Sequence, residues 1–119
     1  MPLYGSQPGM PTPVYPGQQF VLFDGTETPA LGVKSVAFER VPNWDGHPSA
    51  MTFTAVFPNA PTATVQIQAS NDDAEAHYQT LQAINTITGW YSDQGQFRYY
   101  RCVLSAYASG GMPVVIVQR

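Results

Sequence analysis

The chain has 119 residues, the length of one domain, with 11% charged residues and a formal net charge of −3. An ordinary soluble domain carries about 25% charged residues, so this surface is unusually neutral. The five strong bases, Lys34, Arg40, Arg98, Arg101 and Arg119, are scattered, and nucleic-acid binding needs clustered cations that displace counterions from phosphates. Nucleic acid is therefore excluded as a partner. A neutral polar surface suits a protein that lies against neighbours, so we expect an assembly, with a neutral β-domain as the alternative.

The first seventeen residues, MPLYGSQPGMPTPVYPG, hold five of the eleven prolines, three glycines and no charge. Proline fixes φ and lacks an N–H, so this stretch forms neither a helix nor an interior strand. It is typical of polyproline II, which at about 3.1 Å per residue would reach roughly 50 Å. We predict an extended arm, residues 1–17, that lies on a partner; a flexible leader is the alternative. Its apolar anchors would be Leu3, Tyr4, Met10, Val14 and Tyr15.

From residue 18 onward, short runs alternate between apolar and polar residues, and each run ends at Gly, Pro or Asx. This pattern predicts an all-β domain over residues 18–119, an antiparallel β-sandwich of jelly-roll type. Asp72–Leu81 has good helix formers, so one helical turn there is the alternative. The predicted strands are Gln18–Phe23, Val33–Glu39, Ala50–Phe57, Thr64–Ser70, His77–Ile84, Thr86–Tyr91, Phe97–Tyr107 and Met112–Gln118.

In the predicted strand Phe97–Tyr107, successive side chains should point to alternate faces of the sheet. Tyr99 and Arg101 are predicted to project outward together. Tyr and Arg are enriched at interface centres, so this face is a candidate partner contact, with an ordinary amphipathic sheet surface as the alternative. The core face would comprise Tyr100, Cys102, Leu104 and Ala106.

Two groups of residues contain side chains that can bind metal ions. Asn71, Asp72, Asp73 and Glu75 offer oxygens that calcium accepts, but the spacing matches no EF-hand, and Asx residues are what a hairpin turn requires. His47 and His77 form no HxH or HxxxH pair, and Cys102 falls on a core face. We therefore predict a turn at residues 71–75 and no metal.

Catalytic signatures are equally scarce. A Ser-His-Asp arrangement could be drawn from His47 and Asp45, but no nucleophile motif accompanies them. Cys102 is expected to be a buried thiol, and as the single cysteine it excludes an internal disulfide. We expect no catalytic residue, no cofactor and no enzyme activity. No stretch resembles a transmembrane span or a signal peptide, so a membrane partner is not expected either.

Three aromatic residues, Trp44, Trp90 and Tyr91, fall in or near predicted loops. Exposed aromatic rings beside Asp and Asn can form a stacking platform for sugars. Packing in the core or in an interface explains the same residues without a ligand. A glycan site at these residues is the alternative functional hypothesis.

Two stretches carry a family resemblance. VQIQASNDDAEAHYQTLQ is similar to a strand–Asx turn–strand hairpin, and FRYYRCVL with MPVVIVQR resembles later core strands. Together, over roughly residues 50–119, they resemble small jelly-roll modules of tailed-bacteriophage virions: head decoration (cement) proteins and receptor-binding or baseplate modules. Carbohydrate-binding sandwiches share the pattern.

The resemblance implies a structural protein without a catalytic set, located on the outside of a virion. Its partner would be the major capsid protein, whose neighbouring subunits it would clamp. The arm would cross a subunit boundary, and the sandwich would form a homodimer or homotrimer over a local symmetry axis. A carbohydrate-binding module of a tail or other surface structure is the second hypothesis.

Overall fold

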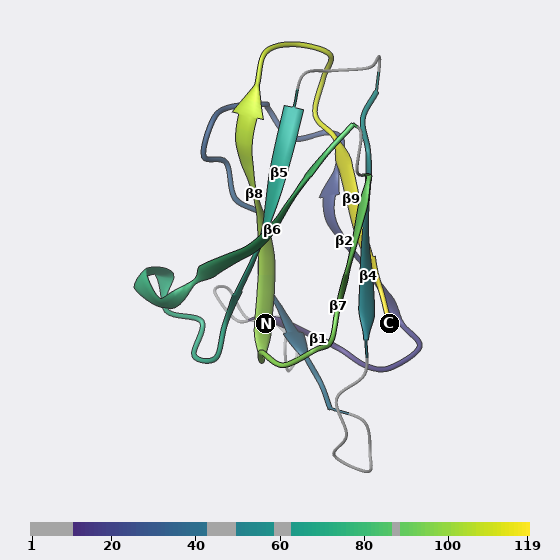
Figure 1. Cartoon of the computed structure of the whole chain (residues 1–119), viewed down its shortest axis with the longest axis vertical. Helices are drawn as coiled ribbons and strands as arrows, with labels where there is room; N and C mark the ends of the chain where they lie inside the picture. The colour runs from purple at the N-terminus through teal and green to yellow at the C-terminus, as the bar shows by residue number, and fades with distance from the viewer. Residues whose placement is uncertain (1–10, 43–49, 59–62, 87–88) are drawn as a thin grey trace, which may run out of the picture.

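The computed structural model describes residues 11–42, 50–58, 63–86 and 89–119, which form two β-sheets packed face to face (Figure 1). One sheet has the strand order β1-β3-β8-β5-β6 and the other β2-β9-β4-β7. The strands are β1 (Thr12–Val14), β2 (Gln19–Asp24), β3 (Phe38–Arg40), β4 (Met51–Val56), β5 (Ala63–Ser70), β6 (Gln79–Asn85), β7 (Trp90–Asp93), β8 (Tyr99–Tyr107) and β9 (Val114–Gln118). A short 3₁₀ helix, η1 (Glu75–His77), precedes β6.

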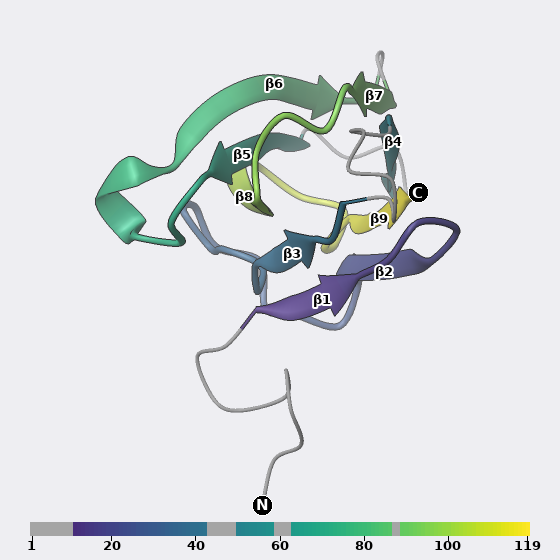
Figure 2. The same ribbon diagram turned by 90° about the horizontal axis from the view of Figure 1, so that it is seen from below.

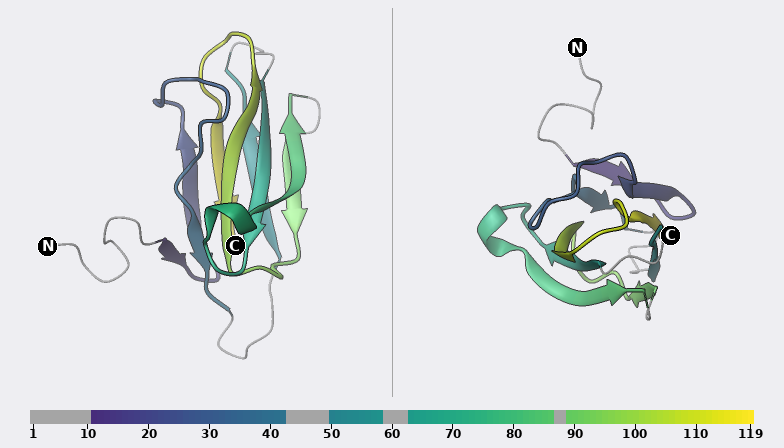
Figure 3. Two further views of the ribbon diagram at one scale, coloured as in Figure 1. Left: turned by 90° about the vertical axis from the view of Figure 1, so that its left-hand side faces the viewer. Right: turned by 90° about the horizontal axis from the view of Figure 1, so that it is seen from above.

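The topology confirms the predicted jelly roll. Strands β2 to β9 divide into two antiparallel four-stranded sheets, β2-β9-β4-β7 and β3-β8-β5-β6, which is the two-Greek-key order of that fold. The strand β1 adds a fifth member to the second sheet, parallel to β3. The two layers are seen end-on in Figure 2 and in the right panel of Figure 3.

The core lies between the sheets and follows the predicted alternation. In β4, Met51, Phe53 and Ala55 are buried while Thr52 and Thr54 are exposed. Burying a large apolar side chain contributes about 1.5–3 kcal/mol, so these alternating positions supply most of the driving force for folding. The centre is aromatic: the rings of Phe38, Phe53 and Tyr100 lie 5.7–6.2 Å apart.

Three strand predictions need correction. Ala106 is exposed, because the register of β5 against β8 shifts between Thr64 and Val65 and the resulting bulge reverses the alternation beyond Leu104. The predicted strand Val33–Glu39 is mostly irregular: only a bridge at Lys34 and the start of β3 pair with β8. The strand predicted at Thr86–Tyr91 begins later, at Trp90.

The predicted arm enters the domain before residue 18. Thr12–Val14 pairs with Phe38–Arg40, and Figure 2 shows β1 beside β3 at the edge of its sheet. An edge strand tolerates Pro13, whose missing N–H needs no partner on the open side. Val14 is only 2% exposed and belongs to the core cluster. The domain's own sheet therefore holds residues 12–14, and Val14 is not available as a partner contact.

Arg119 secures the same edge. The Arg119 guanidinium donates to the carbonyl oxygens of Val14 and Val41, at 2.5 and 2.6 Å, and the Val41 N–H donates to the Val14 carbonyl oxygen as well.

Leu3, Tyr4 and Met10, three of the predicted arm anchors, lie outside the described residues. No helix in the described part of the chain has the length and apolar character that crossing a membrane requires.

Candidate functional site

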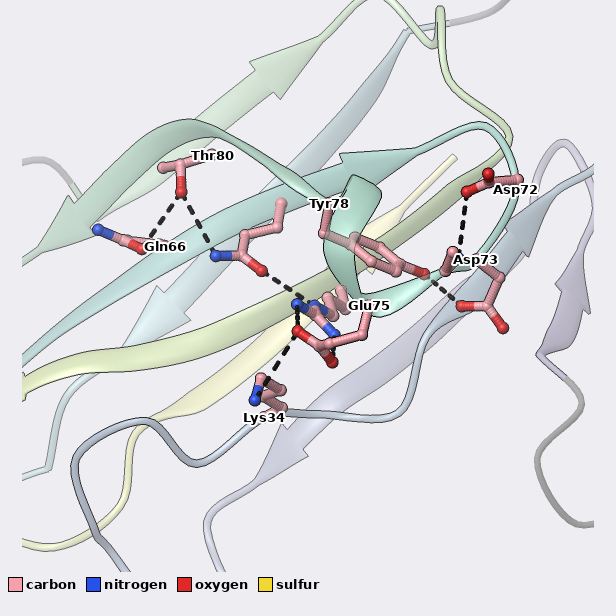
Figure 4. Close-up of polar contacts among 10 residues, drawn as sticks. Lys34, Gln66, Asp72, Asp73, Glu75, Tyr78 and Thr80 are labelled. Carbon is pink, nitrogen blue, oxygen red and sulfur yellow. Dashed lines mark hydrogen bonds and ion pairs between the residues drawn. The ribbon is translucent and has the colours of Figure 1, made fainter.

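A pocket of about 270 Å³ opens where the arm meets the five-stranded sheet. Three segments form its walls: Pro11 from the arm, Ser35–Ala37 from the approach to β3, and the turn between β5 and β6. The turn contributes Asp73, Glu75 and Tyr78, and Arg101 joins them from β8. Figure 4 shows the polar side chains of this region and the contacts between them.

Arg101 is the centre of the site. Its Nε donates to Gln68 Oε1 at 2.9 Å, and its two terminal nitrogens donate to the two Glu75 carboxylate oxygens at 2.7 Å each. Its guanidinium carbon lies 3.9 Å from the centroid of the Tyr78 ring. A bidentate carboxylate pair and a cation–π contact together fix this side chain in one orientation.

The structure places Arg101 on the outer face of the sheet, as predicted, but the residue is only 7% exposed. The chain after β5 folds back over this face, so Glu75 and Tyr78 cover the guanidinium. The alternative of one helical turn within Asp72–Leu81 is realised as η1. Tyr99, the other predicted outward residue, is half-buried beneath the Arg98 guanidinium, which lies 5.1 Å from its ring centroid.

Two aspartates before η1 shape the turn. Asp72 accepts hydrogen bonds from the Ser70 hydroxyl and the Ala74 N–H and contacts His77 Nδ1. Asp73 has a left-handed backbone, with φ of 57°, which Asp tolerates better than most residues. Its carboxylate accepts the Tyr78 hydroxyl at 2.5 Å. These contacts confirm the predicted Asx-rich turn. No three or more His, Cys, Asp or Glu side chains gather as a metal site within the described ranges.

The ionisation of the site follows from these contacts. Hydrogen bonds from Arg101 lower the pKa of Glu75, and the same pair raises the pKa of Arg101. Burial, with a smaller effect of Asp73, raises the pKa of Tyr78 well above its usual range. The Ala74 N–H is the largest cause of a lowered pKa at Asp72. The site therefore holds a charged Arg–Glu pair and a neutral phenol at neutral pH.

The polar groups of the pocket are engaged in internal contacts. The Ser35 hydroxyl donates to the Val36 carbonyl at 2.8 Å and accepts the Cys102 N–H at 2.9 Å, so it is engaged in the structure. Cys102 is fully buried, as predicted, and burial raises the pKa of its thiol to about 12. Beside the paired charges, Val36 is 66% exposed at the rim.

The two predicted glycan residues that the structure describes, Trp90 and Tyr91, do not share a face. Trp90 and Tyr91 are consecutive in β7 and therefore face opposite sides of the sheet. Tyr91 packs on Phe53, with ring centroids 6.1 Å apart, and its hydroxyl donates to Asp93, whereas Trp90 is 62% exposed on the outer face. Trp44 lies outside the described residues. Tyr15, one of the arm anchors, is 49% exposed in the turn between β1 and β2.

Sequence reasoning found Arg101 but missed the residues around it. Glu75 and Tyr78 are 26 and 23 positions away in the chain, and only the pairing of β5 with β8 brings their turn to Arg101. The sequence signal that existed was the turn at residues 71–75 with an acidic residue at its end. Pro11 and Ser35–Ala37 carried no comparable signal.

The comparisons with known proteins show a fold and no family. No protein-family model matches the chain, and no curated protein matches it significantly. Among solved structures, the chain is similar to the crystal structure of the SPBc2 prophage-derived protein YomS, with a TM-score of 0.56. The match covers 85% of this chain and 90% of that chain at 11% sequence identity. The chain therefore shares its fold with a prophage-derived protein.

Proposed function

We propose that this chain is a non-enzymatic structural protein of a bacteriophage particle, which binds the outside of the capsid and stabilises contacts between major capsid subunits. Two findings support a phage role: the jelly-roll topology and the fold shared with a prophage-derived protein. The pocket adds a possible contact surface, because its lining includes the exposed side chain of Val36 beside Pro11 of the arm.

The observation that carries the proposal is the anchoring of the arm. Val14 is inserted into the core, and Arg119 clamps the Val14 carbonyl. Pro11, the first described residue of the arm, therefore lies next to an anchored strand and lines the pocket. Binding by a segment whose base is already ordered loses less conformational entropy than binding by a free tail. In this proposal, Leu3, Tyr4 and Met10 contact a capsid subunit.

Two truncations test the role of the arm. Deleting residues 1–10 leaves β1 and Val14 in place, so the domain should remain folded, whereas deleting residues 1–17 also removes a strand and a core residue. The assay adds purified protein to particles from a phage whose own copy of the gene is deleted, and measures co-sedimentation. Full-length protein should bind, and the protein lacking residues 1–10 should not.

Mass spectrometry of wild-type particles provides the first check. Absence of the chain from purified virions, or full occupancy by the protein lacking residues 1–10, would contradict the proposal. A Val36→Ala variant, changed at the exposed pocket rim, shows whether the pocket contributes to attachment in addition to the arm. A glycan array with the intact protein separates the alternative, because binding that is lost in Trp90→Ala and kept without residues 1–10 would favour a carbohydrate-binding module.

A further inference from the structure

The outer face of the sheet β2-β9-β4-β7 has an ordered pattern of side chains. The register aligns eleven outward residues in rows of four, four and three that cross the strands. The first row is Gln19, Gln118, Thr52 and Ser92; the second is Val21, Ile116, Thr54 and Trp90; the third is Asp24, Val114 and Val56.

This face is almost free of charge. Of its eleven residues only Asp24, at one edge, is ionisable, and its carboxylate accepts hydrogen bonds from Thr26 in the adjoining turn. The five-stranded sheet and its loops, in contrast, hold the ion pairs Arg98–Glu39, Arg101–Glu75 and Lys34–Glu75. The two outer surfaces of one sandwich therefore differ sharply in electrostatic character.

The same face carries apolar side chains on all four of its strands. Trp90 is 62%, Val56 59% and Val21 43% exposed, which makes three of the six large hydrophobic side chains that are exposed in the described part of the chain. Ile116 and Val114 lie half-buried between them. The described residues form two layers, and no further strand or helix among them covers this face (Figure 3). A contiguous apolar patch within a neutral surface marks an interaction site.

We propose that this face is the interface with a second copy of the chain, packed sheet against sheet across a two-fold axis. In such an interface each residue set meets itself. Self-contact would place like charges together on an ordinary polar face, but here ten of eleven residues are uncharged. Sheets pack face to face at about 10 Å, which β-branched side chains such as Val21 and Val56 fill well, and Trp90 provides a large anchor.

The size of the face sets the expected strength. Four strands at about 4.8 Å spacing and about five residues at 3.3 Å cover roughly 300 Å² in projection. A standard interface buries about 800 Å² per partner. The dimer should therefore be weak in free solution, with Kd in the range of about 10 µM to 1 mM, and strong only where a particle holds the two copies side by side.

The test is sedimentation velocity of the full chain over about 10 µM to 1 mM, the range in which such a dimer forms. The mass should rise from the 13.0 kDa of the monomer toward a dimer. Thr54→Lys puts a charge in the central row and should weaken dimerisation at least tenfold. Gln66→Lys, a polar strand position on the other sheet, is the matched control and should dimerise like the unchanged protein.

A charge-pair experiment separates loss of the interface from misfolding. Thr54→Lys and Thr54→Glu should each be monomeric, and their mixture should form a heterodimer, which misfolded variants cannot do. In a Trp44→Phe background, the Trp90 fluorescence should shift to shorter wavelength as the dimer forms.

Three results would overturn the proposal. The first is that the unchanged protein is monomeric at every concentration, and the second is that Thr54→Lys dimerises as well as the unchanged protein. The third is that the unchanged protein is monomeric and Thr54→Lys loses attachment to particles. The last would assign the face to a capsid protein. The outcome is independent of the proposed arm function, because the protein lacking residues 1–10 keeps this face and should dimerise normally.

Discussion

Val14→Ala tests whether the end of the predicted arm belongs to the domain. Val14 is 2% exposed and lies in the core cluster, so the change removes two buried carbon groups. At about 0.8 kcal/mol per group the lost burial is about 1.6 kcal/mol, and the cavity left behind raises the total to about 2–3 kcal/mol. Val36→Ala is the matched control: Val36 is 66% exposed, and the expected loss is about 0.5 kcal/mol or less.

Urea unfolding of both variants, followed by far-UV circular dichroism, gives the free energy of unfolding if the transition is two-state. For a domain of this size, 2–3 kcal/mol corresponds to a fall in Tm of roughly 6–15 °C, which a thermal scan resolves. Equal, small effects of Val14→Ala and Val36→Ala would refute the reasoning. They would mean that residues 12–14 are not part of the stable core.

Two further predictions concern stability. Tyr100→Phe should lower the free energy of unfolding in urea by about 2 kcal/mol, because the Tyr100 hydroxyl donates to Asp93 Oδ2 and accepts the Phe97 N–H. Tyr91→Phe removes a half-buried donor to the same carboxylate and should lower the free energy of unfolding by less. A larger loss in Tyr91→Phe than in Tyr100→Phe would contradict this account. Acidification should destabilise the turn over Arg101. Contacts in the folded state lower the pKa of Glu75 and of Asp72. Their contribution to the stability of the turn is therefore complete above the ordinary carboxyl pKa of about 4 and is lost as pH falls through the lowered values. Hydrogen exchange at the His77 and Tyr78 N–H groups, corrected for the intrinsic pH dependence, should show reduced protection in acid; unchanged protection would contradict the role of these carboxylates.

The predicted arm shows where local reasoning stopped. Proline content argues against a helix and an interior strand for residues 1–17, and the described part of this segment, from residue 11 onward, contains only the edge strand β1. It could not reveal that Thr12–Val14 pairs in parallel with Phe38–Arg40, because that register depends on residues 26 positions away. The sequence predicts that Val14 is an apolar anchor on a partner, and the structure shows it buried in the core of its own domain.

The candidate site was predicted in fragments. The alternation of the strand predicts that Arg101 lies on the outer face, and the Asx content of residues 71–75 predicts a turn. Both assignments hold. Their meeting through Glu75 and Tyr78 depends on the antiparallel pairing of β5 with β8, which no local pattern encodes.

What the sequence determined by itself was the class of structure and the character of the surface. Alternation with period two, broken by Gly, Pro and Asx, predicted a β-sandwich of jelly-roll type, because each strand must bury one face. Low charge and a proline-rich beginning pointed to contact with partners. Tertiary structure alone decided which strands are neighbours, where the bulge turns Ala106 outward, how η1 covers Arg101, and that Val21, Ile116, Thr54 and Trp90 form one row. These features depend on register between distant strands, and register is set by the packing of the whole core.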